Sequence, residues 1–163
     1  MLHYKIRLME ELDAREIVKW SYEAPYAMYN LSDDPEDIQE LLDGSYYAVI
    51  SPENELAGFF CYGRNAQVPG GIREGLYIGD KVLDIGLGLK PELTGEGKGR
   101  DFLESGMEFA RRKYGPERFR LSVAAFNKRA IALYNSVGFK PAGEFVNNNG
   151  KHEMVFMLME CPS

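Results

Sequence analysis

The feature that most constrains the fold is a glycine-rich junction between an apolar, strand-like run and the start of a long amphipathic segment. Residues 87–102 read LGLKPELTGEGKGRDF, with glycines at the alternate positions Gly95, Gly97 and Gly99. Such spacing lets successive backbone N–H groups point into one concavity, and the first turn of a helix adds about half a positive charge. The stretch therefore predicts an anion site, typically for phosphate, at a strand–loop–helix junction.

Two well-known phosphate-binding motifs do not fit this stretch. A Walker A loop requires Ser or Thr after Gly-Lys, whereas Gly99 follows Lys98. The dinucleotide-binding pattern G-x-G-x-x-G, started at Gly95, fails at Arg100. From the loop alone, two interpretations stay open: a phosphate site, and a flexible turn that only caps the helix.

The predicted elements fit one mixed α/β layer architecture. Strands are predicted from alternating or continuous apolar runs, and helices from apolar residues that recur every three to four positions. The strands are expected at 4–8, 46–51, 56–62, 82–89, 119–125, 139–146 and 153–159, and the helices at 10–20, 35–43, 98–114 and 128–136. Residues 65–80 are expected to form a long glycine-rich connection.

Composition and charge narrow the classes of function. The formal net charge of −6 argues against broad nucleic-acid binding, and the apolar runs are shorter than a membrane span. Cys61 and Cys161 are too few for a disulfide framework, so a reducing cytoplasm is the expected location. His3 and His152 lie far apart and no zinc-binding spacing occurs, so no metal is expected.

In this context the glycine stretch resembles the acetyl-CoA-binding motif of the GNAT N-acetyltransferase superfamily. That motif reads [Gln/Arg]-x-x-Gly-x-[Gly/Ala], after a strand and before a long helix. Gly97 and Gly99 match its two small positions, whereas Thr94 stands where Gln or Arg is usual. This departure affects one polar contact and leaves the cradle of backbone amides intact.

A second stretch, residues 121–145 (LSVAAFNKRAIALYNSVGFKPAGEF), resembles the other cofactor segment of that superfamily. The shared pattern is a strand followed by Asn, Ala, Leu-Tyr and Gly-Phe at fixed spacing, and it is matched by Asn127, Ala130, Leu133, Tyr134, Gly138 and Phe139. The similarity is close over residues 82–145. The strand LDIGLGLKPEL is further similar to the branch of ribosomal-protein N-terminal acetyltransferases.

The resemblance implies a single GNAT-like domain over residues 1–163. Its α/β (α+β) fold would have a central mixed, mostly antiparallel sheet, a V-shaped split between the fourth and fifth strands, and about four flanking helices. The pantetheine arm of acetyl-CoA would lie in the split and the diphosphate on the glycine loop. The implied cofactor contacts are Leu87, Leu89, Thr94, Gly95, Gly97, Lys98, Gly99, Arg100 and Asn127. Asn127 would also suit the N-cap of the helix 128–136.

Tyr134 and Asp84 are the implied catalytic residues. A phenol stays protonated at neutral pH, so Tyr134 could donate a proton to the departing thiolate, although the helix pattern alone favours a core tyrosine. Asp84 is the candidate base, directly or through water, and Gly86 and Gly88 on the same strand face would leave space for substrate. The alternative for Asp84 is a solvated acid at a strand edge. Ser122 is a second candidate for relaying the proton.

The acceptor site is expected in the aromatic stretch 22–30, walled by Tyr22, Tyr26, Tyr29 and Asn30, with ordinary packing as the alternative. The expected reaction is direct attack of a primary amine on acetyl-CoA in a ternary complex, with a protein N-terminal amine as acceptor. Two alternatives stay open: a small-molecule amine (polyamine, amino acid or antibiotic) as acceptor, and a non-catalytic acyl-CoA sensor. Homodimers are common among proteins of this kind, and neither nucleic acid nor membrane is an expected partner.

Overall fold

The computed structural model describes residues 4–29, 31–95 and 97–163. The chain forms two compact units: unit 1 comprises residues 1–61 and 87–106, and unit 2 comprises residues 62–86 and 107–163. Within the described residues, seven strands are hydrogen-bonded in the order β1-β2-β3-β4-β5-β7-β6. β4 and β5 run parallel, whereas β1–β2, β2–β3, β5–β7 and β6–β7 are antiparallel. The predicted mixed, mostly antiparallel sheet is therefore confirmed.

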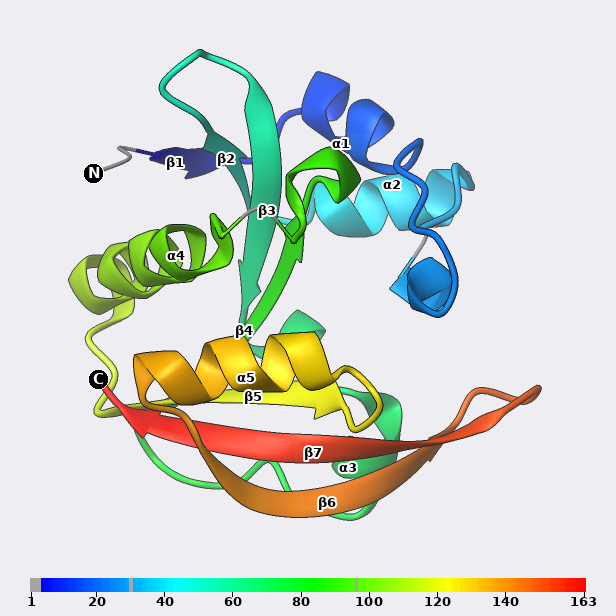
Figure 1. The fold of residues 1–163 in the computed structure, drawn as a ribbon, viewed down its shortest axis with the longest axis vertical. Helices are drawn as coiled ribbons and strands as arrows, with labels where there is room; N and C mark the ends of the chain where they lie inside the picture. Colours follow the sequence, from blue (N-terminus) through cyan, green and yellow to red (C-terminus); the bar gives the residue numbers. More distant parts are fainter. Residues whose placement is uncertain (1–3, 30, 96) are drawn as a thin grey trace. The chain divides into compact units, whose positions relative to one another are not determined.

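Unit 1 holds the N-terminal strands and helices (Figure 1). Its elements are β1 (Lys5–Leu8), α1 (Glu11–Ile17), the 3-10 helix η1 (Tyr26–Tyr29), α2 (Pro35–Leu41), β2 (Tyr46–Ile50), most of β3 (Leu56–Tyr62), the end of β4 (Val82–Leu89), the 3-10 helix η3 (Pro91–Leu93) and the first half of α4 (Gly99–Tyr114). A capping box between Glu10 and Asp13 starts α1. Pro35 at the first turn starts α2, as its sequence predicts.

Two glycines make room for phenylalanine rings in the core of unit 1, because glycine has no Cβ. A Cβ on Gly88 would collide with the Phe59 ring, and a Cβ on Gly106 would collide with the Phe60 ring. Phe60 in turn stacks on Phe102, with ring centroids 4.7 Å apart. The space at Gly88 is thus filled by a ring, which corrects the expectation that this glycine leaves room for substrate.

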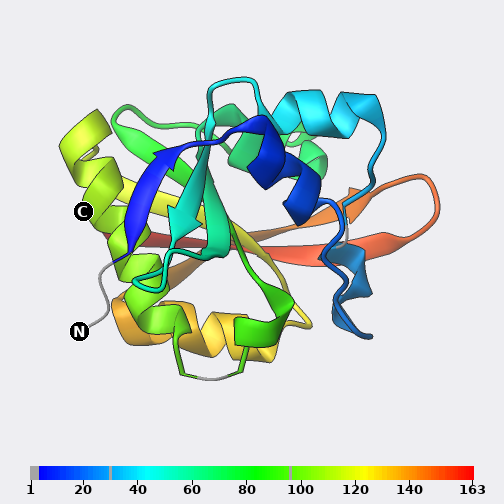
Figure 2. The same ribbon diagram turned by 90° about the horizontal axis from the view of Figure 1, so that it is seen from above.

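Unit 2 comprises the connection between β3 and β4, the start of β4, the end of α4, and β5 (Arg118–Ala124), α5 (Lys128–Val137), β6 (Lys140–Asn148) and β7 (Glu153–Pro162). The helix α5 lies along one face of β5, β7 and β6, and the connection between β3 and β4 covers the other face (Figures 1 and 2). On that second face a cluster of buried residues packs with partly buried ones from the connection: Ala124, Phe145, Phe156 and Leu158 with Val68, Leu76 and Tyr77.

The connection of residues 63–81 contains two short helices, the 3-10 helix η2 (Arg64–Ala66) and α3 (Pro69–Arg73). A Cβ on Gly70 would collide with the carbonyl oxygen of Val146, and the Gly70 N–H donates to Asn147 Oδ1 at 2.8 Å. A Cβ on Gly71 would lie 2.7 Å from the Tyr77 ring. Gly70 therefore lets α3 dock closely on β6, and Gly71 lets it pack against Tyr77. The two glycines also explain why a sequence pattern does not reveal this helix, because glycine disfavours helices.

The remaining elements agree with their predicted positions to within a few residues. In the described residues there are five α-helices rather than about four, because α3 was not predicted. None of these helices combines the length and the apolar character needed to cross a bilayer. β4 is in register with β5 over residues 82–84. The V-shaped split beyond these residues stays a prediction, as does the single domain.

Candidate active site

The glycine loop lies in unit 1, between η3 and α4. Gly95 and Gly97 have φ of 76° and 77°, in the left-handed region that favours glycine. A Cβ on Gly97 would meet nothing within 4 Å, so the absence of a side chain there serves no packing purpose within unit 1. Gly99 is the first residue of α4. This combination is that of an open backbone loop leading into the positive end of a 16-residue helix.

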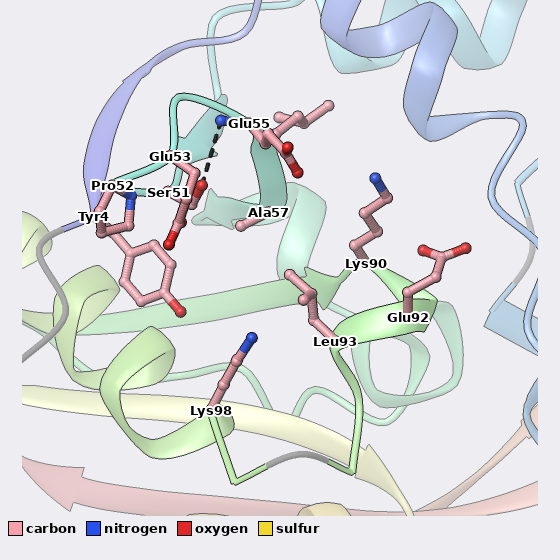
Figure 3. A pocket seen from close by; sticks show the side chains of 11 residues that line it. Tyr4, Ser51, Pro52, Glu53, Glu55, Ala57, Lys90, Glu92, Leu93 and Lys98 are labelled. Carbon is pink, nitrogen blue, oxygen red and sulfur yellow. Dashed lines mark hydrogen bonds between the residues drawn. The ribbon is translucent and has the colours of Figure 1, made fainter.

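The polar side chains around this loop are engaged locally. The Thr94 hydroxyl donates to the Pro91 carbonyl at 2.7 Å, which closes η3. Arg100 pairs with Glu104 one turn along the exposed face of α4, at 3.1 Å. Lys98 lines a hollow of about 270 Å³ together with Tyr4, Lys90 and eight other residues (Figure 3). The anion site at this loop stays a prediction, and Glu96 lies outside the described residues.

Tyr22, one of the aromatic residues expected to wall the acceptor site, is tied to the end of β4. Its hydroxyl donates to the Leu89 carbonyl at 2.7 Å. Burial raises the pKa of Tyr22 to about 12, with a smaller contribution from Glu92, so its phenol stays a hydrogen-bond donor at neutral pH. Leu87 lies two residues earlier on the same strand, half-buried. The aromatic stretch singles out Tyr22, but no local sequence signal predicts its bond to Leu89, because the two residues are 67 positions apart.

The expected acceptor residues fall in the same unit. Tyr26 and Tyr29 belong to η1, and Asn30 lies outside the described residues. Residues 20–63 contain no lysine or arginine but nine carboxylates, making this stretch more negative than the whole chain: Glu23, Asp33, Asp34, Glu36, Asp37, Glu40, Asp43, Glu53 and Glu55. The Tyr22 bond ties this acidic, aromatic segment to the end of β4 in unit 1.

In unit 2, α5 carries the second predicted cofactor segment. Asn127 Oδ1 accepts a hydrogen bond from the Ala130 N–H at 3.1 Å, so the predicted N-cap is confirmed. At the other end the N–H groups of Gly138 and Phe139 donate to the Tyr134 carbonyl, and Gly138 has φ 120°. The buried Phe139 ring contacts the Tyr134 ring edge-on, at 6.1 Å between centroids. The Tyr…Gly-Phe spacing thus reflects a helix C-cap that holds the Tyr134 ring in place.

Asp84 is buried, and both oxygens of its carboxylate accept hydrogen bonds from neighbouring side chains. Arg120 Nε donates to Oδ1 at 2.6 Å and Arg120 Nη2 to Oδ2 at 2.9 Å, and Gln67 Nε2 donates to Oδ2 at 2.8 Å. The side chains of Asp84 and Arg120 are only 4% and 5% exposed. The surroundings are therefore those of a buried ion pair, not of a solvated strand-edge acid. The role of Asp84 as base stays a prediction, and this geometry argues against it.

Ser122 lies two residues beyond Arg120 on β5. Its hydroxyl is 2.6 Å from the Tyr77 hydroxyl, which also accepts from the Val68 N–H at 2.9 Å. Burial raises the pKa of Tyr77, against the lowering effect of its hydrogen bonds to Ser122 and Val68. Across the described ranges, no three His, Cys, Asp or Glu side chains are grouped as they would be around a metal ion.

The chain matches the model of the acetyltransferase (GNAT) family over residues 11–139. This match covers most of the sequence, and the chain belongs to the GNAT family of acetyltransferases. It is accordingly an N-acetyltransferase, and acetyl-CoA is the acyl donor of its family. The finer assignment to the ribosomal-protein branch is not confirmed. No curated protein sequence matches the chain.

Solved structures of the same fold cover nearly the whole chain. A GNAT-family acetyltransferase from Bacillus anthracis aligns with a TM-score of 0.76 at 14% identity, covering 99% of this chain and 98% of its own. A protein assigned as a phosphinothricin N-acetyltransferase aligns with a TM-score of 0.72 at 18% identity, covering 98% of both chains. The dodecameric spermidine N-acetyltransferase from Vibrio cholerae aligns with a TM-score of 0.65 at 20% identity, covering 98% of this chain and 93% of its own. At these identities the likeness shows the fold alone.

Proposed function

We propose that this N-acetyltransferase moves the acetyl group of acetyl-CoA to a small-molecule primary amine that carries more than one positive charge, such as a polyamine. The observation that carries the proposal is the acidic segment of residues 20–63, which has no basic residue and is tied to the end of β4 by the bond from Tyr22 to Leu89. Carboxylates attract a polycation, and aromatic rings bind ammonium groups through their faces.

Acetyl-CoA would be held chiefly by backbone groups. Its diphosphate would bind the amides of the loop from Gly95 to Arg100, where two glycines have positive φ and α4 begins. The backbone of Leu87 and Leu89 would pair with the pantetheine arm, and Asn127 would add a polar contact beside its capping bond. Thr94 and Lys98 are assigned to the edge of the same loop. These contacts would position the thioester, and positioning supplies much of the acceleration of acyl transfer.

Tyr134 would act as the general acid. The amine nitrogen attacks the thioester carbonyl carbon, the C–S bond breaks, and the Tyr134 phenol gives its proton to the leaving sulfur. Tyr134 suits this task because the C-cap of α5 and the Phe139 ring fix its position. The proton lost by the amine would leave through water, since the Asp84 carboxylate is occupied by three donors.

The comparisons support a small-molecule acceptor more than a protein N-terminus. The solved neighbours include enzymes described as acting on spermidine and on phosphinothricin, both of them small amines. Tyr26, Tyr29 and Asn30 stay the assigned residues for the acceptor, within the acidic segment. Some of these neighbours are oligomers, and a homodimer stays a proposal for this chain.

An acceptor screen tests the proposal. Purified protein is given acetyl-CoA and one amine at a time, and free thiol and acetylated product are both measured. The panel contains spermidine and a diamine, a monoamine of matched length, a neutral amino acid, an aminoglycoside and a peptide with a free N-terminus. We expect the highest kcat/KM with the polycationic amines and a steep fall in rate with added salt. Turnover of the peptide alone would contradict the proposal and favour the N-terminal acceptor.

A further inference from the structure

The buried ion pair in unit 2 links three segments of that unit. Asp84 on β4 and Arg120 on β5 are direct register partners in the parallel ladder. The guanidinium of Arg120 uses Nε and Nη2 on Asp84 and donates through Nη1 to the Ile78 carbonyl at 2.7 Å. Gln67, at the other end of the connection 63–81, donates to the same carboxylate. The ion pair is therefore the point where β4, β5 and both ends of the connection are joined.

An aromatic and hydroxyl cluster extends this junction along the same face of β5. The Arg120 guanidinium carbon lies 5.2 Å from the centre of the Tyr77 ring. The Tyr77 hydroxyl bonds to Ser122 and to the Val68 N–H, so the connection is held from Gln67 to Ile78 by groups that contact β4 or β5. The connection of 19 residues, 63–81, is therefore an ordered segment that covers one face of the sheet, not a free loop. We call this segment the wall.

The position of the pair along β4 gives it a functional consequence. Asp84 is the last residue of β4 in register with β5, while β4 itself continues to Leu89. Leu87 and Leu89, the residues proposed to pair with pantetheine, follow on the same strand. A bidentate guanidinium–carboxylate pair has a defined geometry that a monodentate pair lacks. It can therefore fix where the pairing of the two strands ends.

We propose that Arg120 is a positioning residue for acetyl transfer: through its ion pair with Asp84 and its bond to Ile78, it fixes the end of the β4–β5 pairing and the wall formed by residues 63–81. This inference rests on the proposed function, because positioning matters only if β4 binds the acyl donor. It assigns Asp84 to the support of β4, in place of the role of base.

Two variants separate positioning from simple stabilisation. Arg120→Lys keeps the charge opposite Asp84 but loses the planar fork, so it cannot hold Asp84 and Ile78 together as arginine does. The double variant Asp84→Leu/Arg120→Met replaces the ion pair by apolar groups, and such replacements often keep or raise stability. Arg118→Gln is the matched control, because Arg118 lies on β5 like Arg120 but forms a partly exposed ion pair, to Glu160 on β7.

The experiment combines hydrogen exchange of the whole chain with steady-state kinetics, using acetyl-CoA and the best amine of the screen. In Arg120→Lys and in the double variant we expect faster exchange of the amides of residues 64–84, unchanged exchange in α5, and a kcat lowered by about a hundredfold. The control should match the wild type in both measurements. A double variant that folds with wild-type exchange and wild-type kcat would overturn the proposal.

The exchange measurement also keeps the two proposals apart. If the wild-type protein acetylates no amine in the screen, the proposed function fails, and the exchange of residues 64–84 alone then decides whether Arg120 fixes the wall. If Arg120→Lys folds poorly, the double variant still carries the test, since it contains no uncompensated buried charge.

Discussion

The two regions proposed to act on acetyl-CoA differ in whether backbone or side-chain groups do the work. In unit 1 the loop from Gly95 to Gly99 offers backbone, with positive φ at two glycines and open space where a Cβ at Gly97 would lie. In unit 2 the working parts are buried side chains, above all Tyr134, which is held by a helix C-cap and by the Phe139 ring. Substituting a larger residue for a glycine should therefore impair the function of the loop, and truncating a buried side chain should impair the function of unit 2.

The largest effect is expected at Tyr134. Tyr134→Phe removes only the hydroxyl and keeps the ring contact with Phe139, so fold and acetyl-CoA affinity should be retained. General acid catalysis contributes about a hundred- to ten-thousand-fold, and kcat should fall by that factor. Pre-steady-state measurement of acetyl transfer is the test. A variant that transfers acetyl as fast as the wild type would make Tyr134 a packing residue.

Asp84→Asn should act on stability before it acts on chemistry. It leaves the buried Arg120 without a charged partner, and breaking such a pair costs about 3–5 kcal/mol. The residual activity should keep the wild-type shape of its pH–rate profile, because the substitution removes no proton acceptor of the reaction. Denaturant unfolding and the pH–rate profile are measured on the same preparation. Loss of the limb in which rate rises with pH would instead identify Asp84 as the base.

Gly88→Val tests the contrast between glycines within unit 1. A side chain there would collide with the Phe59 ring, and overpacking a core typically costs about 1–3 kcal/mol. The midpoint of urea unfolding should fall accordingly. Phe59→Ala in the same background makes room for the valine, and should recover part of the loss if the collision is the cause. An unchanged midpoint in Gly88→Val would show that Phe59 does not need this space.

The smallest effect is expected at Asn127. Asn127→Ala removes the cap of α5 and should lower stability by about 1 kcal/mol. Asn127→Ser is the matched control, because serine also caps helices, and it should restore stability. If Asn127 in addition contacts acetyl-CoA, the serine variant will bind the cofactor more weakly than the wild type despite its restored stability. Equal affinity in calorimetry would leave Asn127 with the capping role alone.

The sequence predicts what local patterns determine. The start of α4 after the glycine loop, the cap at Asn127 and the hairpin of β2 and β3 all follow from residues close together in the chain. The contacts that redefine the site join distant residues: Tyr22 with Leu89 across 67 positions, and Asp84 with Arg120 across 36. A strand pattern shows that Asp84 faces one side of a sheet, but it does not show that an arginine lies opposite. For this reason the sequence presents Asp84 as a free carboxylate.

Calorimetric titration of acetyl-CoA, ATP and NAD into wild-type protein and the Gly97→Val variant tests the central claim most directly. The claim is that the open glycine loop binds the diphosphate of acetyl-CoA through its amides. Wild type should bind acetyl-CoA more tightly than either nucleotide, and the variant should retain the fold but lose about tenfold or more in affinity, as expected for lost hydrogen bonds to a charged group. Unchanged affinity in a folded Gly97→Val variant, or tighter binding of ATP or NAD, would contradict the account.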